Sequence, residues 1–406
     1  MSLALFINKR LIGSKGSKKK ISATIIFIAQ VAVALGIIVT LLTISIGIGF
    51  RKSIKERLSG FNGHVLVTTY EANSSFESSA LQNVDSLTTT LNQIHDIDCF
   101  QKVVIKSGII KTDSLYEGVV MKGVGNDFNR KAYRNYIRKG KIPQFGQQND
   151  SILLSERIAK NLHLDVGDKM YMYFIRDEKP VVRQFYIAGL YNTGIKEIDQ
   201  NYIIGDIEHV RRLNRWKNNE VAALEIYVKD INHLQQVSDE VFDKIGPQYY
   251  AENAFQLNPQ IINWVELFDV NMFVIIGVIF LVVAINIIMA LLILIIDRTP
   301  MIGTLKALGA TNWQIRKVFL YNAVFILSMG LLAGNGIAIT LLLFQKYFGI
   351  VSLDPDFYYV EKVPVYLNGF YILLINIVAI LLCTLVLIIP TYIISKIPPV
   401  KAIKFR

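Results

Sequence analysis

The chain has 406 residues, of which 52% are hydrophobic and 18% are charged, and its formal net charge is +11. This apolar content exceeds that of an ordinary soluble globular protein. The two cysteines, Cys99 and Cys383, are too few for a disulfide framework or a cysteine-based metal site. Composition therefore favours a membrane protein without cysteine chemistry.

Residues 1–20 are predicted to form a short cytoplasmic helix on the membrane surface, because apolar residues recur there at helical spacing among basic ones. A disordered basic tail is the alternative. Residues 21–50 contain no Asp, Glu, Lys or Arg and are longer than the roughly 20 residues that cross a bilayer. Because this stretch is too long for a signal peptide, we predict a first transmembrane helix that continues beyond the membrane as a stalk.

Residues 51–269 are predicted to form a large external α+β domain, because strand and helix patterns alternate along them. Two parts of this region, residues 64–111 and 223–255, each contain a strand, an amphipathic helix and a second strand. We expect these two β-α-β units to pack together as a split α/β subdomain formed by residues 60–117 and 220–257.

The insert between the two units, residues 118–219, is predicted to be a mostly β subdomain. Residues 168–175 and 181–188 alternate in polarity, so we expect them to pair as a hairpin across the short turn at 176–180.

Three further charge-free stretches, residues 270–296, 318–345 and 363–395, predict three more transmembrane helices. Residues 346–362 between the last two form a short external segment. The fold class is therefore a membrane protein with four transmembrane α-helices and a large α+β domain between the first and second. Four asparagines within the spans are interpreted as hydrogen-bonding groups between helices: Asn286, Asn322, Asn335 and Asn376.

The basic residues predict how the chain is oriented. Fourteen of the 43 Lys and Arg precede the first span, lie between the second and third, or follow the fourth, and Asp297 is the one acid among them. This pattern places both termini, the segment 297–317 and the tail 396–406 in the cytoplasm. Because the charge flanks spans and is not gathered on one soluble face, it does not predict nucleic-acid binding.

The charged interruption at residues 297–310 is predicted to form a short amphipathic helix. Thr299 can cap this helix, Pro300 suits its first position, and Gly309 can end it in a left-handed conformation. The apolar residues at positions i, i+4 and i+7 are Met301, Leu305 and Leu308. A partner must cover this face, either lipid headgroups or another protein.

No catalytic or metal motif is present in the sequence. The five histidines lack metal spacing, and neither HExxH, a nucleophile elbow nor CxxC occurs. No phosphate-binding Gly-x4-Gly-Lys-Ser/Thr loop occurs either, so any ATP that drives this protein must bind to another chain.

Several local motifs accompany this arrangement of one span, a large external domain and three more spans. They are Gly303-Thr304-Leu305-Lys306-Ala307-Leu308-Gly309-Ala310-Thr311 with Gln314-Ile315-Arg316, Gly49-Phe50, Gly63-His64-Val65, Phe357-Tyr358-Tyr359-Val360, and Ile397-Pro398-Pro399-Val400-Lys401-Ala402-Ile403. Together they resemble the FtsX/MacB superfamily of ABC-transporter permeases over essentially the whole chain. Within that superfamily the chain resembles the lipoprotein-releasing LolC/LolE type.

The resemblance implies that the segment after the second span is a coupling helix that rests on a separate, LolD-like ATPase subunit. Its contact residues would be Arg298, Met301, Ile302, Leu305, Lys306 and Leu308. ATP and Mg would be bound by that ATPase, so this chain would carry no cofactor and would not be an enzyme. A second permease chain, identical or related, would complete the unit.

The resemblance also implies a bacterial inner-membrane location with a periplasmic domain, and a cavity that receives the acyl chains of a lipoprotein. The residues expected to line it are Leu42, Ile46, Phe50, Phe268 and Met272, although each could instead face lipid or a dimer partner. Relatives that recruit a periplasmic carrier extend the hairpin into a hook. Here the turn at 176–180 is short, so carrier docking by this chain is left open.

Two other functions are known in the superfamily. One is MacB-like mechanotransmission that drives efflux or export, and the other is FtsX-like signalling to a cell-wall hydrolase. The external domain is large for the FtsX type, and the Tyr358-Tyr359 segment favours lipoprotein release.

Overall fold

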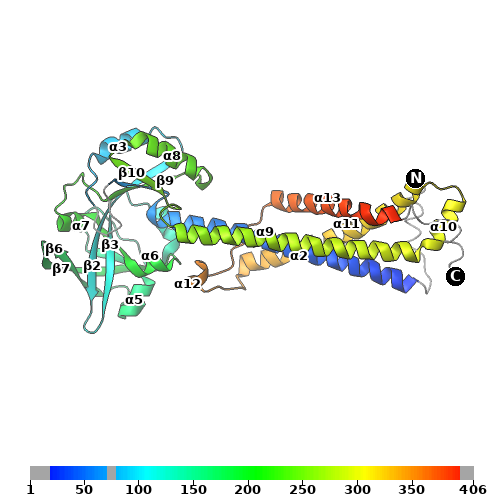
Figure 1. Cartoon of the computed structure of the whole chain (residues 1–406). Helices are drawn as coiled ribbons and strands as arrows, with labels where there is room; N and C mark the ends of the chain where they lie inside the picture. Colours follow the sequence, from blue (N-terminus) through cyan, green and yellow to red (C-terminus); the bar gives the residue numbers. More distant parts are fainter. Residues whose placement is uncertain (1–18, 71–78, 394–406) are drawn as a thin grey trace. The chain divides into compact units, whose positions relative to one another are not determined.

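The computed structural model describes residues 19–70 and 79–393 (Figure 1). The predicted helix at 1–20 and the cytoplasmic tail at 396–406 therefore lie almost entirely or entirely outside the described residues. The chain divides into two compact units. The described parts of Met1–Phe50, Val265–Val351 and Val363–Arg406 form a helical unit, and Arg51–Trp264 with Ser352–Lys362 form an α/β unit.

Four helices in the described residues are long and apolar enough to cross a membrane. They are α2 (Lys19–Asn62), α9 (Pro259–Asp297), α11 (Asn312–Phe348) and α13 (Gly369–Ile393). The four predicted spans are thereby confirmed. Helix α2 continues without interruption to Asn62, as the stalk prediction requires. The short helix α10 (Thr299–Ala307) follows α9 after Arg298.

Small residues bring α11 close to α2 in the helical unit. A Cβ built on Gly330 would lie 2.7 Å from the Val33 side chain, and one on Gly334 would lie 2.8 Å from the Ala34 carbonyl oxygen. Larger side chains would therefore separate the two helices.

One of the predicted interhelical asparagine contacts is confirmed. Asn335 of α11 and Asn376 of α13 exchange side-chain hydrogen bonds of 2.7 and 3.0 Å. Asn286 and Asn322 donate to the carbonyls four residues earlier in their own helices, Val282 and Val318, and make no side-chain bond to another helix among the described residues. Asn335 and Asn376 make the same bonds within their own helices, to the carbonyls of Leu331 and Ile372, so their interhelical bonds come in addition.

The described part of the α/β unit contains ten strands in one sheet. They are β1 (Val65–Thr69), β2 (Ile97–Lys111), β3 (Tyr116–Val124), β4 (Ile137–Gly140), β5 (Ser151–Ser155), β6 (Lys169–Arg176), β7 (Lys179–Tyr191), β8 (Tyr202–Asp206), β9 (Ala223–Val228) and β10 (Tyr249–Asn253). The helices among them are α3 (Val84–Leu91), α4 (Arg130–Tyr133), η1 (Arg134–Tyr136), α5 (Glu156–Leu162), α6 (Lys196–Asn201), α7 (Ile207–Asn214), η2 (Ile231–His233), α8 (Leu234–Ile245) and α12 (Pro355–Tyr358).

The predicted split α/β fold is confirmed. Units β1-α3-β2 and β9-α8-β10 interleave in the order β10-β1-β9-β2, and all neighbours in this order are antiparallel. Helices α3 and α8 lie together over one face of these strands (Figure 1). The apolar residues of both helices fill the core there, including Val84, Leu91, Val237 and Val241.

The β-rich insert is built on the same sheet, through strand β2. Residues Ile97–Val103 of β2 pair with β9, and Val103–Lys111 pair with β3. From β3 the pairing continues through β8, β5, β7 and β6, and β6 pairs back to β2. The insert is therefore a closed barrel that shares one strand with the split α/β half.

The predicted hairpin is formed by β6 and β7. Its turn is tighter than expected, because Arg176 and Lys179 still pair and only Asp177 and Glu178 turn the chain. Both turn residues have positive φ, 52° and 60°, as a two-residue hairpin turn requires. Asp177 also forms an ion pair of 2.5 Å with Arg215.

Candidate functional site

Of the two capping interactions predicted for helix α10, only the C-terminal one is formed. Thr299 does not cap the helix, because its hydroxyl donates to the Ile295 carbonyl oxygen at 3.1 Å, and Arg298 occupies the cap position. The C-terminal prediction is confirmed: Gly309 has φ +89°, and Ala310 N–H donates to the Leu305 carbonyl at 2.9 Å. Thr311 and Gln314 then form the predicted capping box at the start of α11.

The apolar face predicted for a partner ATPase is largely used by the chain itself. Ile302 is fully buried in a cluster with residues of α2, α9, α11 and α13, and Met301 and Leu305 pack partly against that cluster. A buried Ile302 cannot touch a partner in this conformation, so its assignment as a contact residue is corrected. Leu308 is 79% exposed.

Two exposed residues, one on α10 and one at the start of α11, were not among the predicted contact residues. Thr304 is exposed on α10, and Trp313, in the first turn of α11, is an exposed large aromatic residue. The Lys317 ammonium lies 5.4 Å from the centre of the Trp313 ring. Arg298 and Lys306 are half-buried at the margin. An exposed Trp within the capping box was the available signal.

The five residues predicted to line a lipoprotein cavity divide into two groups. Phe50 and Phe268 pack with ring centres 5.6 Å apart, and Met272 lies against Gly47, where an added Cβ would be 2.5 Å from its sulfur. These three residues therefore join α2 to α9 within the chain. Leu42 and Ile46, which lie about two turns and one turn before Phe50 on α2, are half-exposed.

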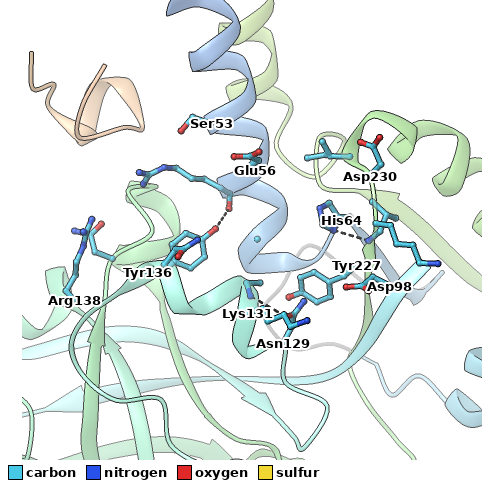
Figure 2. A pocket seen from close by; sticks show the side chains of 18 residues that line it. Ser53, Glu56, His64, Asp98, Asn129, Lys131, Tyr136, Arg138, Tyr227 and Asp230 are labelled. Carbon is cyan, nitrogen blue, oxygen red and sulfur yellow. Dashed lines mark hydrogen bonds between the residues drawn. The ribbon is translucent and has the colours of Figure 1, made fainter. Parts of the chain in front are cut away.

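A polar cavity of about 620 Å³ lies in the α/β unit. Figure 2 shows its lining side chains, with Ser53 and Glu56 on α2, Tyr136 and Arg138 near β4, and Tyr227 on β9. Both signs of charge occur around it: Arg57, Lys131, Arg138 and Lys229 against Glu56, Asp98 and Asp230. Three of these cations bond to protein oxygens. Arg57 donates to the Thr193 carbonyl at 2.5 Å, Lys229 to that of His95 at 2.5 Å, and Arg138 pairs with the Glu361 carboxylate.

A buried charged network fixes the end of α2 beside this cavity. Lys122 of β3 forms an ion pair of 2.6 Å with Glu225 of β9. Its ammonium also donates to the carbonyl of Phe61, near the C-terminus of α2, and to the Tyr133 hydroxyl at 3.1 Å. Gln101 of β2 donates to the second Glu225 oxygen at 2.8 Å. A cation at a helix C-terminus is favourable, so the network ties α2 to three strands.

Burial dominates the electrostatics of this network. Burial lowers the pKa of Lys122 and raises the pKa of Glu225, while the charge of each residue partly offsets the shift of the other. His64, at the rim of the cavity, accepts a hydrogen bond from Val228 N–H at 3.2 Å, and burial lowers its pKa to about 4. This imidazole is therefore neutral at ordinary pH.

The part of the chain that the structure describes holds no group of three or more His, Cys, Asp or Glu arranged to bind a metal ion. The Cys99 thiol is half-buried, and burial raises its pKa to about 11, which disfavours a reactive thiolate.

Comparison with known families gives two matches. The family described as MacB-like periplasmic core domain matches residues 26–243, more than half of the chain. The family described as FtsX-like permease C-terminal matches residues 273–399.

Relatives that match over nearly their whole length include proteins named lipoprotein-releasing system transmembrane protein. LolC of Xylella fastidiosa strain Temecula1 is 21% identical over 92% of this chain and 92% of its own length. LolC of Neisseria meningitidis serogroup B is 22% identical over 100% of both chains. LolE of Haemophilus influenzae is 20% identical over 99% of both.

Proposed function

Since the chain belongs to the FtsX/MacB superfamily of ABC-transporter permeases, we propose that it is the permease subunit of a transporter that extracts lipoproteins from the inner membrane. The observation that carries this proposal is the full-length similarity to proteins named LolC and LolE. The four apolar helices would hold the chain in the membrane, with both termini in the cytoplasm and the α/β unit in the periplasm. Cargo would pass to a periplasmic carrier.

The driving energy would come from a separate ATPase subunit, which binds ATP and Mg, because this sequence has no phosphate-binding loop. The ATPase would contact the exposed side of α10 at Thr304 and Leu308, with Trp313 beside them. Arg298, Lys306, Met301 and Leu305 would support this contact from the half-buried margin.

A second permease chain would complete the cavity for acyl chains. Leu42 and Ile46 are half-exposed and could contact cargo or that second chain, whereas Phe50, Phe268 and Met272 would shape the α2–α9 wall behind them. Apolar side chains suit acyl chains because both are excluded from water.

A second candidate function is MacB-like mechanotransmission, in which motion of the external domain drives export without carrying cargo through the membrane. The match of residues 26–243 to the MacB-like periplasmic core domain favours it.

The test is purification of the chain with its co-expressed ATPase from membranes that contain triacylated lipoproteins. Extraction predicts bound lipoprotein that is released on ATP addition. Leu42→Asn with Ile46→Asn is expected to lower the bound amount while the ATPase stays attached. Leu35→Asn, at an exposed position earlier in α2, serves as the matched control. An ATPase complex without lipoprotein, and unresponsive to it, would exclude extraction in favour of mechanotransmission.

A further inference from the structure

The segment between α11 and α13 packs on the α/β unit, although helices of the other unit flank it in sequence. We name this segment, Ser352–Lys362, the strap. Its two ends meet through a β-bridge between Ser352 and Lys362 and a hydrogen bond of 2.8 Å from Leu353 N–H to the Glu361 carbonyl. Helix α12 lies between them. The strap is thus a closed loop with its own backbone bonds.

Three side chains hold the strap on the α/β unit. Glu361 forms an ion pair with Arg138 of β4, and each side chain is 37% exposed. The Tyr359 ring meets Trp264 edge to face, with ring centres 6.0 Å apart, and Val360 is buried. These contacts give a structural role to Tyr359 and Val360 of the sequence motif, which neither the proposed coupling surface nor the proposed cavity uses.

The backbone at the centre of the strap is strained. Tyr359 has φ +58°, in the left-handed region that a residue with a Cβ rarely adopts. Such a conformation persists only where surrounding contacts enforce it, and such residues are concentrated at switching and binding segments. Tyr359 directly follows α12, where a left-handed residue commonly ends a helix, and its ring meets that of Trp264.

The outer attachment of the strap is weak, because an exposed ion pair is screened by water and salt. The attachment of α2 is different, because Lys122 and Glu225 are almost completely buried and would be left as unpaired charges if they separated. The charged attachment of α2 is therefore buried, whereas the charged attachment of the strap is exposed.

We propose that the strap is a releasable latch, closed by Arg138 and Glu361, that opens and closes on the α/β unit. Arg138 also lines the polar cavity. Opening the latch removes the carboxylate partner of this guanidinium. On the proposed function, the state of the latch changes with the nucleotide bound to the ATPase.

The first experiment is a charge swap read by hydrogen–deuterium exchange of the full chain. Arg138→Glu and Glu361→Arg are each expected to speed exchange across residues 352–362 by about two- to fivefold, because an exposed ion pair contributes modestly. The double variant is expected to restore the original rate. High salt should speed exchange in the unmodified protein and not in the single variants.

The matched control is Lys139→Glu, which breaks the neighbouring exposed pair between Lys139 of β4 and Asp165. It is expected to leave exchange of the strap unchanged, and amides of the β2–β3 ladder report that the fold is intact. Unchanged strap exchange in both single variants, or no restoration in the double variant, would overturn the latch.

The second experiment compares exchange in the complex with its ATPase, nucleotide-free and with a non-hydrolysable ATP analogue. A difference confined to the strap is expected, and equal exchange in both states overturns the link to nucleotide. If no ATPase binds, the proposed function is wrong. The charge-swap experiment on the chain alone still tests whether the strap is a latch.

Discussion

Lys122 of β3 and Glu225 of β9 form an ion pair of 2.6 Å in which each side chain is only 2% exposed. The pair joins the barrel to the split α/β half beneath the last turn of α2, whose Phe61 carbonyl accepts from the same ammonium. The sequence alone would place both residues on the surface, because a lysine and a glutamate on strands ordinarily face solvent.

Removing one member of this pair should strongly destabilise the α/β unit. Glu225→Leu leaves the Lys122 ammonium buried without its carboxylate, which we expect to cost about 3–5 kcal/mol. Lys122→Met with Glu225→Leu should cost less than the sum of the single changes, because no charge is stranded. Urea unfolding of the purified protein measures these changes. Lys102→Met is the control, because its pair with Asp85 is exposed; additive losses would contradict the coupling.

The buried imidazole of His64 should make stability fall in acid. Burial lowers its pKa from 6.5 to about 4. Between these two pH values the imidazole is protonated in the unfolded chain and neutral in the folded chain. Stability is therefore full above pH 6.5 and declines towards pH 4, by at most about 3 kcal/mol. In the His64→Gln variant, the free energy of unfolding should depend less on pH between about pH 4 and pH 6.5. An unchanged pH dependence of the unfolding free energy in the His64→Gln variant would contradict this assignment.

The asparagine pair between α11 and α13 should contribute modestly to the helical unit. Asn335→Leu removes both reciprocal bonds with Asn376 and is expected to cost about 0.6–2 kcal/mol. Asn286→Leu is the matched control, because Asn286 is exposed and bonds only within α9. Unfolding of the detergent-solubilised chain distinguishes them, and equal losses would show that the interhelical bonds carry no special weight.

The exposed side of α10 should decide ATPase binding. Leu308→Asp is expected to weaken binding of the ATPase subunit about tenfold or more while the chain stays folded, because Leu308 makes no core contact. Ile302→Asp should unfold the surroundings of α10, because it buries a charge in the core of the helical unit. Titration of ATPase onto the purified permease, with thermal unfolding beside it, separates the two effects. If the Leu308 variant bound the ATPase with unchanged affinity, the ATPase would contact another surface of the permease.

The elements of this protein could be predicted from its sequence wherever one local pattern decided the structure. Charge-free length was enough for the four spans, because an unpaired charge or a broken backbone is costly in lipid. Alternating and helical periodicity was enough for the two β-α-β units and the β6–β7 hairpin. Local backbone chemistry was enough for Gly309 and for the Thr311–Gln314 capping box.

Contacts between distant segments were decided only by the tertiary structure. Periodicity placed Met301, Leu305 and Leu308 on one face but could not tell that α2, α9, α11 and α13 bury the neighbouring Ile302. No pattern along the chain pairs Lys122 with Glu225 or Arg138 with Glu361, which are separated by 103 and 223 residues. The periodicity of apolar residues along a helix or strand shows which side of that element each residue occupies. What covers that side depends on the packing of the whole chain, and here that packing separates a buried anchor from an exposed strap.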